Sequence, residues 1–386
     1  MSETAARRRA TMVEVAHAAG VSVMTVSYTY GRPERVSADT RARVREAAER
    51  LGYPGPHPGA RSLRRGRTGT LGVVLGEHLT YAFDDPQATR FLSGVAGVCA
   101  DHGMALTLVP ITGGPSDVDR VTEAAVDGFV VWTTADDDPV IDAIAATGLP
   151  AVVHGGPRRD GLSFVAVDDR AAAEAVGREV FAGARRPAVL SFPLDRDRIS
   201  TVTFGAATAG TVPGAASGID PDATTAGAAS GIDPDAATFR VTRRRLLGFR
   251  DAWAKAGGEW SQVRVAVCSI NSAREAEALA AELLTGPDAC DAIAAMGDEL
   301  ALGTLRTAAR LGFAVPGDVT VSGWDDTDAA APAGLTTVAQ SLRDQGARCA
   351  RIALGRLTST DRDAEVAWNL VRRASTRRSQ RRRAQP

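Results

Sequence analysis

Cysteine, lysine and long apolar runs are scarce in this sequence of 386 residues, and each shortage excludes a class of protein. The cysteines are far apart, whereas disulfide frameworks and zinc sites need closely spaced pairs, so we expect buried free thiols in a reducing compartment. The histidines are equally dispersed. We therefore predict no metal site, no cofactor and no Ser/His/Asp arrangement, which leaves an enzyme as the less favoured alternative. The four cysteines are Cys99, Cys268, Cys290 and Cys349.

The chain also lacks any stretch of about 18 apolar residues, so the sequence predicts no transmembrane helix. Its N-terminus carries three arginines but not the apolar run of a signal peptide that should follow them. Apolar residues make up 44% and charged residues 24%, both ordinary for a globular protein of two or three domains. We therefore expect a cytoplasmic protein with no membrane partner.

The net charge is only −1, yet the charge is unevenly distributed. Residues 1–67 contain 13 arginines against 6 acidic residues, whereas the remainder contains 32 basic and 40 acidic residues. A basic segment on an acidic body is typical of a phosphate-binding module attached to another domain. A solvated run of charge is the simpler alternative. Almost all of the positive charge is arginine, because Lys255 is the only lysine.

Three short helices are predicted near the N-terminus. Each follows a Ser or Thr whose hydroxyl can cap a helix, and Thr11 with Glu14 has the spacing of a capping box. Gly20 permits a sharp turn after the first helix, and Gly52 is suited to end the third. Apolar residues at helical spacing supply a small three-helix core. The helices are expected over 12–19, 23–30 and 38–51.

The next segment, YPGPHPGARSLRRGRTG, has alternating prolines and several glycines, which marks residues 56–68 as a linker or hinge. Within it, residues 60–64 have the composition to form one or two helical turns.

From Thr70 onward, short apolar runs alternate with helical stretches, as in parallel α/β sheets. The runs fall into two groups, roughly 70–167 and 187–330, which predicts two doubly wound lobes with a cleft between them. A repeated GAASGIDPDA motif lies in an Ala/Gly-rich segment at about 200–238, which we interpret as a flexible insertion of no assigned function. Residues 377–386 are Arg-rich and expected to be a disordered basic tail.

Eight segments together resemble the lactose/galactose repressor (LacI/GalR) family, in the family's order from about Thr11 to Thr376. The resemblance implies an all-α helix-turn-helix headpiece (1–55) and an α/β periplasmic-binding-protein-like effector domain of two doubly wound lobes (69–376). It also implies a homodimer that binds a near-palindromic double-stranded DNA operator, with its affinity changed by a small molecule. The segments are VAHAAGVSVMTVS (15–27), RVSADTRARV (35–44), LGY (51–53), ARSLRRGRTGTLGVV (60–74), VDDRAAA (167–173), RRRLLGF (243–249), DELALGTLR (298–306) and GWDDTDAAAPAGLTTVAQ (323–340).

In a helix-turn-helix, the second helix enters the major groove. By resemblance, Val23 and Met24 hold the positions that most distinguish operators among relatives. Both are apolar, so they can contact thymine methyl groups but cannot donate hydrogen bonds. Packing of either residue in the core is the alternative, although Val26 has the better core spacing. Other residues suited to base or phosphate contacts are Thr11, Ser22, Thr25, Ser27, Arg35, Ser37, Thr40 and Arg41.

Tyr28 stands where many relatives place an arginine, whose guanidinium fork can bind guanine. A phenol cannot make that bidentate contact, so the operator should lack the guanine preference, although Tyr28 could instead pack against the headpiece surface. Tyr30 lies on another face and is expected to be core or hinge-facing.

At the hinge, Arg61, Ser62 and Leu63 resemble the family's minor-groove helix, in which the leucine wedges between base pairs. Gly59 occupies a position where an apolar helix former is usual, and glycine costs roughly 1 kcal/mol in a helix. The hinge also contains one extra residue. We expect it to fold less readily or to change the spacing between half-sites.

Ligands in such sheets bind at the carboxyl ends of strands. Asp168 and Asp325 follow predicted strands and, by resemblance, face the cleft, while Arg245 matches an effector-clamping arginine. Each acid could instead be a helix N-cap or part of a salt bridge between lobes. Weaker effector-binding candidates are Arg196, Thr134, Asp298 and Phe83.

The resemblance is weaker around the pocket. Residues 85–88 read Asp-Pro-Gln-Ala where relatives have Asn-Pro-aromatic-aromatic, Ile270 replaces a frequent aromatic residue and Gly297 a common asparagine. A standard hexose is therefore in doubt, and a polyol, sugar or nucleoside-like effector is predicted. Repression is favoured over activation. An effector-unresponsive regulator remains an alternative, and a solute-binding protein is disfavoured by the basic headpiece.

Overall fold

The structure, a computed structural model, describes residues 10–55, 67–76, 79–206, 231–357 and 363–377. The chain divides into an N-terminal unit that ends at Gly69 and a C-terminal unit that begins at Thr70. The predicted hinge residues Arg61, Ser62 and Leu63 lie outside the described residues, as does most of the Ala/Gly-rich segment.

Three α-helices form the N-terminal unit, as predicted. Thr11 and Glu14 complete the capping box, and Gly20 ends the first helix in the left-handed conformation (φ 63°). Val15, Val26 and Val44 are fully buried at the centre of the small core that joins the helices. The helices are α1 (Met12–Ala19), α2 (Val23–Gly31) and α3 (Ala38–Leu51), with a short 3-10 helix, η1, at Pro33–Arg35.

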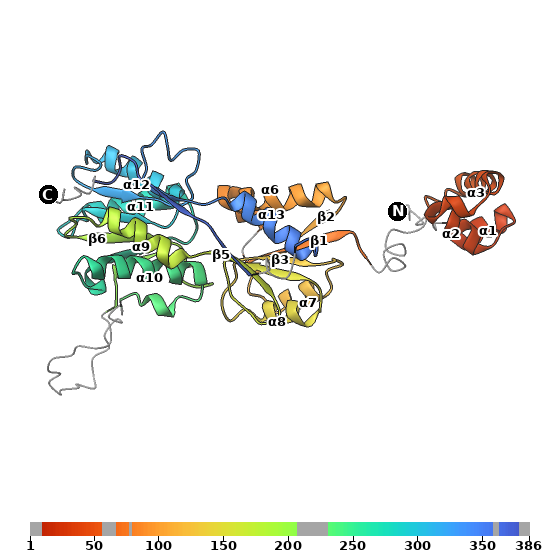
Figure 1. The fold of residues 1–386 in the computed structure, drawn as a ribbon, viewed down its shortest axis with the longest axis horizontal. Helices are drawn as coiled ribbons and strands as arrows, with labels where there is room; N and C mark the ends of the chain where they lie inside the picture. Colours follow the sequence, from red (N-terminus) through yellow and green to blue (C-terminus); the bar gives the residue numbers. More distant parts are fainter. Residues whose placement is uncertain (1–9, 56–66, 77–78, 207–230, 358–362, 378–386) are drawn as a thin grey trace, which may run out of the picture. The chain divides into compact units, whose positions relative to one another are not determined.

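The first lobe of the C-terminal unit is built on a parallel sheet with the strand order β12-β5-β4-β3-β1-β2. One face packs against α6 and α13, and the other against α7 and α8 (Figure 1). The strands are β1 (Thr70–Leu75), β2 (Ala105–Pro110), β3 (Phe129–Trp132), β4 (Ala151–His154), β5 (Ser163–Val167) and β12 (Asp363–Val366). The helices are α5 (Leu79–Asp84), α6 (Pro86–Asp101), α7 (Asp117–Thr122), α8 (Pro139–Ala146) and α13 (Leu342–Ala353).

The second lobe has the strand order β10-β9-β6-β8-β7, and all pairs are parallel except the edge pair of β7 with β8. Helices α9 and α10 cover one face, and α11 and α12 cover the other. The strands are β6 (Pro187–Ser191), β7 (Thr201–Phe204), β8 (Arg264–Val267), β9 (Ala292–Ala295) and β10 (Thr320–Ser322). The helices are α9 (Asp169–Val180), α10 (Arg240–Lys255), α11 (Ala273–Leu284) and α12 (Asp298–Arg310), with 3-10 helices η2 (Pro234–Ala236) and η3 (Trp260–Gln262).

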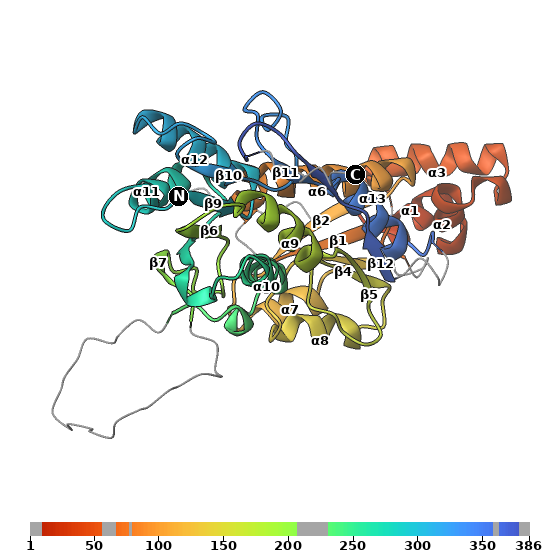
Figure 2. The ribbon, with the colours of Figure 1, turned by 60° about the vertical axis from the view of Figure 1, so that its left-hand side comes forward.

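After the second lobe, the chain returns to the first, which the sequence pattern does not predict. Strand β11 (Thr337–Ala339) pairs with β13 (Asn369–Val371), while α13 and β12 between them belong to the first lobe. Figures 1 and 2 both show α13 beside α6. Gly94 and Gly346 permit this approach, because a Cβ atom at either position would collide with the backbone of the other helix.

Two predicted boundaries need correction. Residues 201–204, assigned to the insertion, form strand β7, because their backbone completes the sheet edge beside β8. Arg377, assigned to the disordered tail, donates from Nε and one terminal nitrogen to the carbonyls of Pro316 and Gly317 at 3.2 and 3.0 Å.

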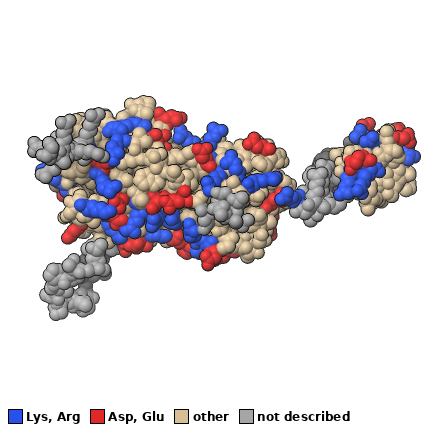
Figure 3. Space-filling model, in the orientation of Figure 1, with Lys and Arg blue, Asp and Glu red and all other residues tan. Residues whose placement is uncertain are grey.

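Acidic and basic side chains are interspersed on the face of the C-terminal unit shown in Figure 3. Many form ion pairs, such as Arg170 with Asp251 at 2.6 Å and Arg178 with Glu174 at 3.2 Å. The acidic residues of this unit, which outnumber its basic residues, therefore do not form a single acidic patch on the face shown. Of the helices that the structure describes, none is long and apolar enough to cross a membrane. The four cysteines are buried and unpaired, as predicted.

Candidate DNA-binding helix and effector pocket

Helix α2 presents an apolar N-terminal surface. Ser22 caps it, because its hydroxyl accepts a hydrogen bond from the Thr25 amide at 3.0 Å. The next two side chains, Val23 and Met24, are 42% and 57% exposed, whereas Val26 is fully buried. The alternative that Val23 or Met24 belongs to the core is therefore not supported. The side chains of Val23 and Met24 are therefore free to contact a molecule that binds to the surface of the N-terminal unit.

The two tyrosines of α2 have different surroundings. Tyr28 is half-buried, and the Arg35 guanidinium lies over its ring, 5.9 Å from the centroid. Tyr30 packs edge-on against Tyr53 at 6.0 Å beside the core, and partial burial raises its pKa. The structure thus places Tyr30 in the packing of the unit, as expected, and leaves part of Tyr28 accessible.

The predicted phosphate-contacting residues include helix caps. Thr11, Ser22 and Ser37 are exposed and cap α1, α2 and α3 respectively. Capped helix N-termini direct backbone amides outward, where phosphate oxygens can accept hydrogen bonds. Ser27 differs, because only 6% of it is exposed. Its predicted DNA contact needs correction, since it faces the interior one residue after Val26. Thr25, Arg35, Thr40 and Arg41 all retain exposed surface.

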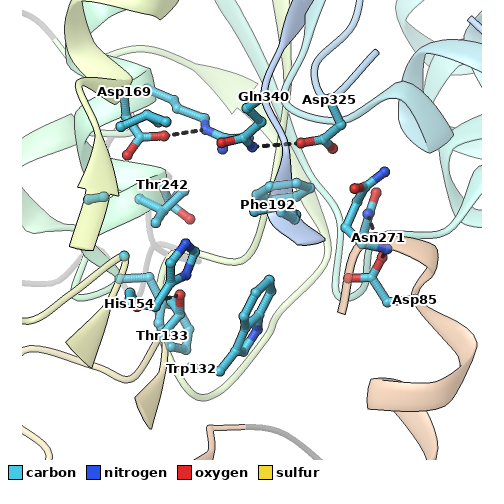
Figure 4. A pocket seen from close by; sticks show the side chains of 18 of the residues that line it. Asp85, Trp132, Thr133, His154, Asp169, Phe192, Thr242, Asn271, Asp325 and Gln340 are labelled. Carbon is cyan, nitrogen blue, oxygen red and sulfur yellow. Dashed lines mark hydrogen bonds and ion pairs between the residues drawn. The ribbon is translucent and has the colours of Figure 1, made fainter. Parts of the chain in front are cut away.

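A cavity lies between the two lobes of the C-terminal unit, where carboxyl ends of strands from both sheets converge (Figure 4). Its volume is about 120 Å³, space for roughly four water molecules at the ~30 Å³ that each occupies in liquid water. Ring side chains of Trp132, Phe192 and Phe239 supply apolar walls. The polar side chains that line it are Asp85, Gln87, Thr133, His154, Asp169, Arg198, Thr242, Arg245, Asn271, Asp325, Gln340 and Gln345.

Arg245 is anchored in this cavity from helix α10. Its Nε donates to Asp169 at 2.9 Å, and a terminal nitrogen donates to the Met296 carbonyl. Its guanidinium carbon lies 3.8 Å from the ring centroid of Trp324. Arg245 and Asp169 are both at least 94% buried, and burial raises the pKa of Asp169 in spite of the opposing effect of Arg245. The cavity therefore contains a rigidly held cation and its counter-ion.

Asp325 follows β10 and adopts an unusual backbone conformation for a non-glycine residue (φ 104°). Its Oδ1 accepts a hydrogen bond from Gln340 Nε2 at 2.7 Å. Burial raises the pKa of this carboxyl well above its usual range, and Arg245 only partly opposes that effect. Conformations of this kind cost about 1–3 kcal/mol and concentrate at ligand sites.

Asp85 joins the two lobes at the opposite side of the cavity. It caps α6, which begins at Pro86, and its Oδ1 accepts from the Gln87 amide at 3.0 Å. The same oxygen accepts from Asn271 Nδ2 of the second lobe at 3.3 Å. Gln87 is 95% buried, and its side-chain nitrogen has no hydrogen-bond partner among the described residues. This nitrogen is a donor available to a bound molecule.

The structure supports two of the predicted effector residues and corrects others. Arg245 and Asp325 line the cavity, but Asp168 does not. Asp168 caps α9 by accepting from the Ala171 amide at 3.2 Å, and it pairs with Arg244 at 2.9 Å. The cavity carboxyl is that of the next residue, Asp169. The N-cap alternative for Asp168 is therefore the one that the structure supports.

Four weaker candidates lie elsewhere. Thr134 and Arg196 line a neighbouring cavity, where Arg196 pairs with Asp138 at 2.9 Å. Asp298 is buried and accepts hydrogen bonds from the Thr327 amide and the Thr337 hydroxyl, both at 2.7 Å, so it organises the loop after β10. Phe83 is 63% exposed and is not among the residues that line the cavity.

Sequence reasoning missed most of the polar lining. Three of the missed residues lie at the ends of secondary-structure elements: Asp85 precedes a helix, His154 ends a predicted strand and Asn271 follows one. The carboxyl ends of strands are where α/β proteins place ligand-binding groups. That signal was present, but it does not distinguish these residues from other polar loop residues. Within the described residues, no group of three His, Cys, Asp or Glu side chains could hold a metal ion.

Two family models match this chain. Residues 11–55 match the bacterial regulatory proteins of the lacI family, and residues 221–379 match the periplasmic binding protein-like domain. The HTH-type transcriptional regulator IpsA of Corynebacterium glutamicum is 36% identical over 345 residues, which cover 87% of this chain and 88% of IpsA. The chain belongs to the LacI family. It is therefore a DNA-binding transcription regulator and not an enzyme.

Solved structures share the fold of this LacI-family protein. The complex of the regulator CelR with cellobiose is 23% identical, with a TM-score of 0.57, and the match covers 95% of this chain and 100% of that chain. The lac repressor dimer bound to its operator and an anti-inducer is 20% identical, with a TM-score of 0.64, and the match covers 96% and 99% of the two chains. The headpiece and two-lobed body expected from the sequence are thus confirmed.

Proposed function

We propose that this LacI-family protein is a homodimeric repressor whose operator affinity is controlled by a small polyol or sugar-like effector in the cavity between its lobes. The observation that carries the proposal is that cavity, because it combines ring side chains with two buried polar atoms, Gln87 Nε2 and His154 Nδ1, that have no hydrogen-bond partner among the described residues. The lac repressor structure is an operator complex and the CelR structure is a cellobiose complex, and these two similar proteins support the two halves of the proposal.

The DNA half rests on the N-terminal surface of α2. Val23 and Met24 are exposed and apolar, so they suit the methyl groups of thymines in the major groove. Tyr28 offers one hydroxyl and part of a ring where a guanidinium would bind guanine. We therefore propose a near-palindromic operator that contains thymines opposite Val23 and Met24 and has no required guanine opposite Tyr28.

The effector half rests on the balance of donors and acceptors. Gln87 Nε2 and the Arg245 guanidinium can donate, whereas His154 Nδ1 and the carboxyls of Asp85 and Asp325 can accept. A neutral molecule with several hydroxyl groups satisfies both kinds of group, because each hydroxyl both donates and accepts. The ring side chains can cover its apolar C–H faces.

Replacing Gln87 with leucine should weaken effector binding by about 10-fold, because one hydrogen bond to a buried polar group contributes roughly 1–2 kcal/mol. Folding should be retained, since the amide nitrogen that is removed has no partner among the described residues. Titration calorimetry with whichever of ribose, glucose, sorbitol or cellobiose binds the wild type measures the effect. Gln262→Leu, at an exposed position on η3, is the matched control. An unchanged affinity in Gln87→Leu would place the effector elsewhere.

The dimer interface is proposed on the face that carries Phe83 and Ile270. These side chains are 63% and 40% exposed, and Ile270 lines a groove together with Pro86 and with Asp84, the residue that follows Phe83. Clustered exposed apolar residues mark interaction surfaces. Phe83→Asp should convert the dimer to a monomer at micromolar concentration in sedimentation velocity. Phe204→Asp, 44% exposed on the edge strand β7, should leave the dimer intact; equal behaviour of the two variants would exclude this face.

A further inference from the structure

A chain of hydrogen bonds crosses the cavity from one lobe to the other. His154 Nε2, at the end of β4, lies 2.8 Å from Gln345 Oε1 on α13. Gln345 Nε2 donates to Gln340 Oε1 at 3.2 Å, and Gln340 Nε2 donates to Asp325 Oδ1 at 2.7 Å. Figure 4 shows Gln340 reaching Asp325 on one side of the cavity and His154 on the other. We call this chain of hydrogen bonds the relay. At one end it joins His154 to Gln345, which are 191 positions apart in the sequence, and at the other end it joins Asp325 to Gln340, which are 15 positions apart.

The acid at one end fixes the direction of every bond in this relay. Gln340 turns its NH₂ group toward Asp325 and its carbonyl toward Gln345. Asp325 Oδ1 accepts this bond whether the carboxyl is ionised or carries a proton on its other oxygen. Gln345 then turns its NH₂ group toward Gln340 and its carbonyl toward His154. A carbonyl also only accepts, so His154 must carry its proton on Nε2. Its Nδ1 is consequently an acceptor.

The surroundings of His154 hold its ring in place. The imidazole stacks on the indole of Trp132, with centroids 5.0 Å apart and planes 12° apart, and it also contacts Phe91 at 4.7 Å. The residue is 93% buried, and Nδ1 has no hydrogen-bond partner within the described part of the chain. Burial lowers the pKa of His154 to about 4, so the ring is neutral at physiological pH.

We propose that Asp325, acting through Gln340 and Gln345, sets the tautomer of His154 and so makes this wall of the cavity select a ligand group that donates a hydrogen bond. The effector presents a hydroxyl or N–H group to His154 Nδ1, and an ether or carbonyl oxygen at that position is disfavoured. A buried acceptor opposite another acceptor loses its hydrogen bond without regaining water, which is the mismatch that sites of this kind reject most strongly. The ligand part of this inference rests on the proposed function, whereas the tautomer part does not.

The tautomer can be measured without any ligand. Long-range proton–nitrogen spectra of the full chain labelled with ¹⁵N-histidine distinguish the Nε2–H, Nδ1–H and cationic forms, and loss of a signal in His154→Gln assigns the resonance. At pH 7.5 we expect the Nε2–H form for His154. His102 is an internal reference with its proton on the other ring nitrogen. Its Nδ1 lies 2.9 Å from the Val98 carbonyl oxygen, so Nδ1 must carry the proton and donate it. An Nδ1–H or cationic His154 would overturn the proposal.

Two variants test whether the relay causes this tautomer. Asp325→Leu does not touch the imidazole but removes the group that sets the direction, so the Nε2–H population of His154 should fall from nearly all to a mixture. Gln345→Leu should have the same effect, and Gln262→Leu should have none. Asp325→Gly, which also lacks a side-chain acceptor and adopts the positive φ at this position without strain, serves if the leucine variant does not fold. A pure Nε2–H form in the folded Asp325 and Gln345 variants would show that the relay does not set the tautomer.

The ligand part is read from the same resonance. Saturation with whichever of ribose, glucose, sorbitol or cellobiose binds should shift the His154 Nδ1 signal in the direction of an accepted hydrogen bond. A bound sugar that leaves this signal unchanged would contradict the contact. Failure of every sugar to bind would instead count against the proposed effector class, while the tautomer result would stand on its own.

Discussion

Replacing Arg245 with methionine should lower the free energy of unfolding by about 3–5 kcal/mol, because the substitution leaves the Asp169 carboxyl buried without its cation. Asp169 is 98% buried, and Arg245 Nε is its hydrogen-bond donor at 2.9 Å. The substitution also removes the bond to the Met296 carbonyl and the stacking on Trp324. Equilibrium unfolding in urea, followed by tryptophan fluorescence, measures the loss.

A matched control lies on the same helix. Arg250 pairs with Asp235 at 3.4 Å, but Asp235 is 62% exposed, and such surface pairs contribute at most about 1 kcal/mol. Arg250→Met should therefore have little effect. The double variant Arg245→Met with Asp169→Leu should recover part of the lost stability, since no charge remains buried alone. If Arg245→Met and Arg250→Met were equally stable, the cavity would not depend on the Arg245–Asp169 pair.

Replacing Met24 with aspartate should weaken operator binding by about 10- to 100-fold, the range expected when a base contact of roughly 1–3 kcal/mol is lost. The new carboxylate also faces the phosphates that line the groove. Because Met24 is 57% exposed, the headpiece should keep its fold. Fluorescence anisotropy with labelled operator at about 0.15 M salt measures the change, since DNA affinity depends strongly on salt.

The control for Met24→Asp is Phe204→Asp, which adds the same charge on the edge of the second lobe. Its operator affinity should stay within about twofold of the wild type. Unrelated DNA gives the second comparison, because loss of a base contact reduces specific binding more than non-specific binding. Equal losses on operator and unrelated DNA would show that Met24 contributes only through charge.

The elements that could be predicted from the sequence are those set by local chemistry. The capping groups Thr11, Ser22 and Ser37 and the turn at Gly20 defined the headpiece helices to within a residue. The alternation of apolar runs with helices likewise indicated two α/β lobes. The return of α13 and β12 to the first lobe was not predicted, because the β12 pairing with β5 joins segments about 200 residues apart and leaves no local signal.

The candidate site was harder to predict for a related reason. Arg245 and Asp325 came from the resemblance and do line the cavity. Asp168 and Asp169 are adjacent acids after one strand, and only the start of α9 decides that the first caps the helix and the second faces Arg245. The hydrogen bond between His154 and Gln345 depends on the packing of α13 in the first lobe. The sequence near either residue contains no pattern that predicts this packing.

We expect helix α2 to bind a specific operator, and we expect a ligand in the cavity to control the affinity for that operator. The most direct test is to sequence the genomic fragments that the purified protein retains at about 0.15 M salt, with and without a sugar that binds the cavity. We expect the retained fragments to share one inverted-repeat motif and their retention to change when the sugar is present. Retention of fragments with no shared motif, at a level the sugar does not alter, would contradict this expectation.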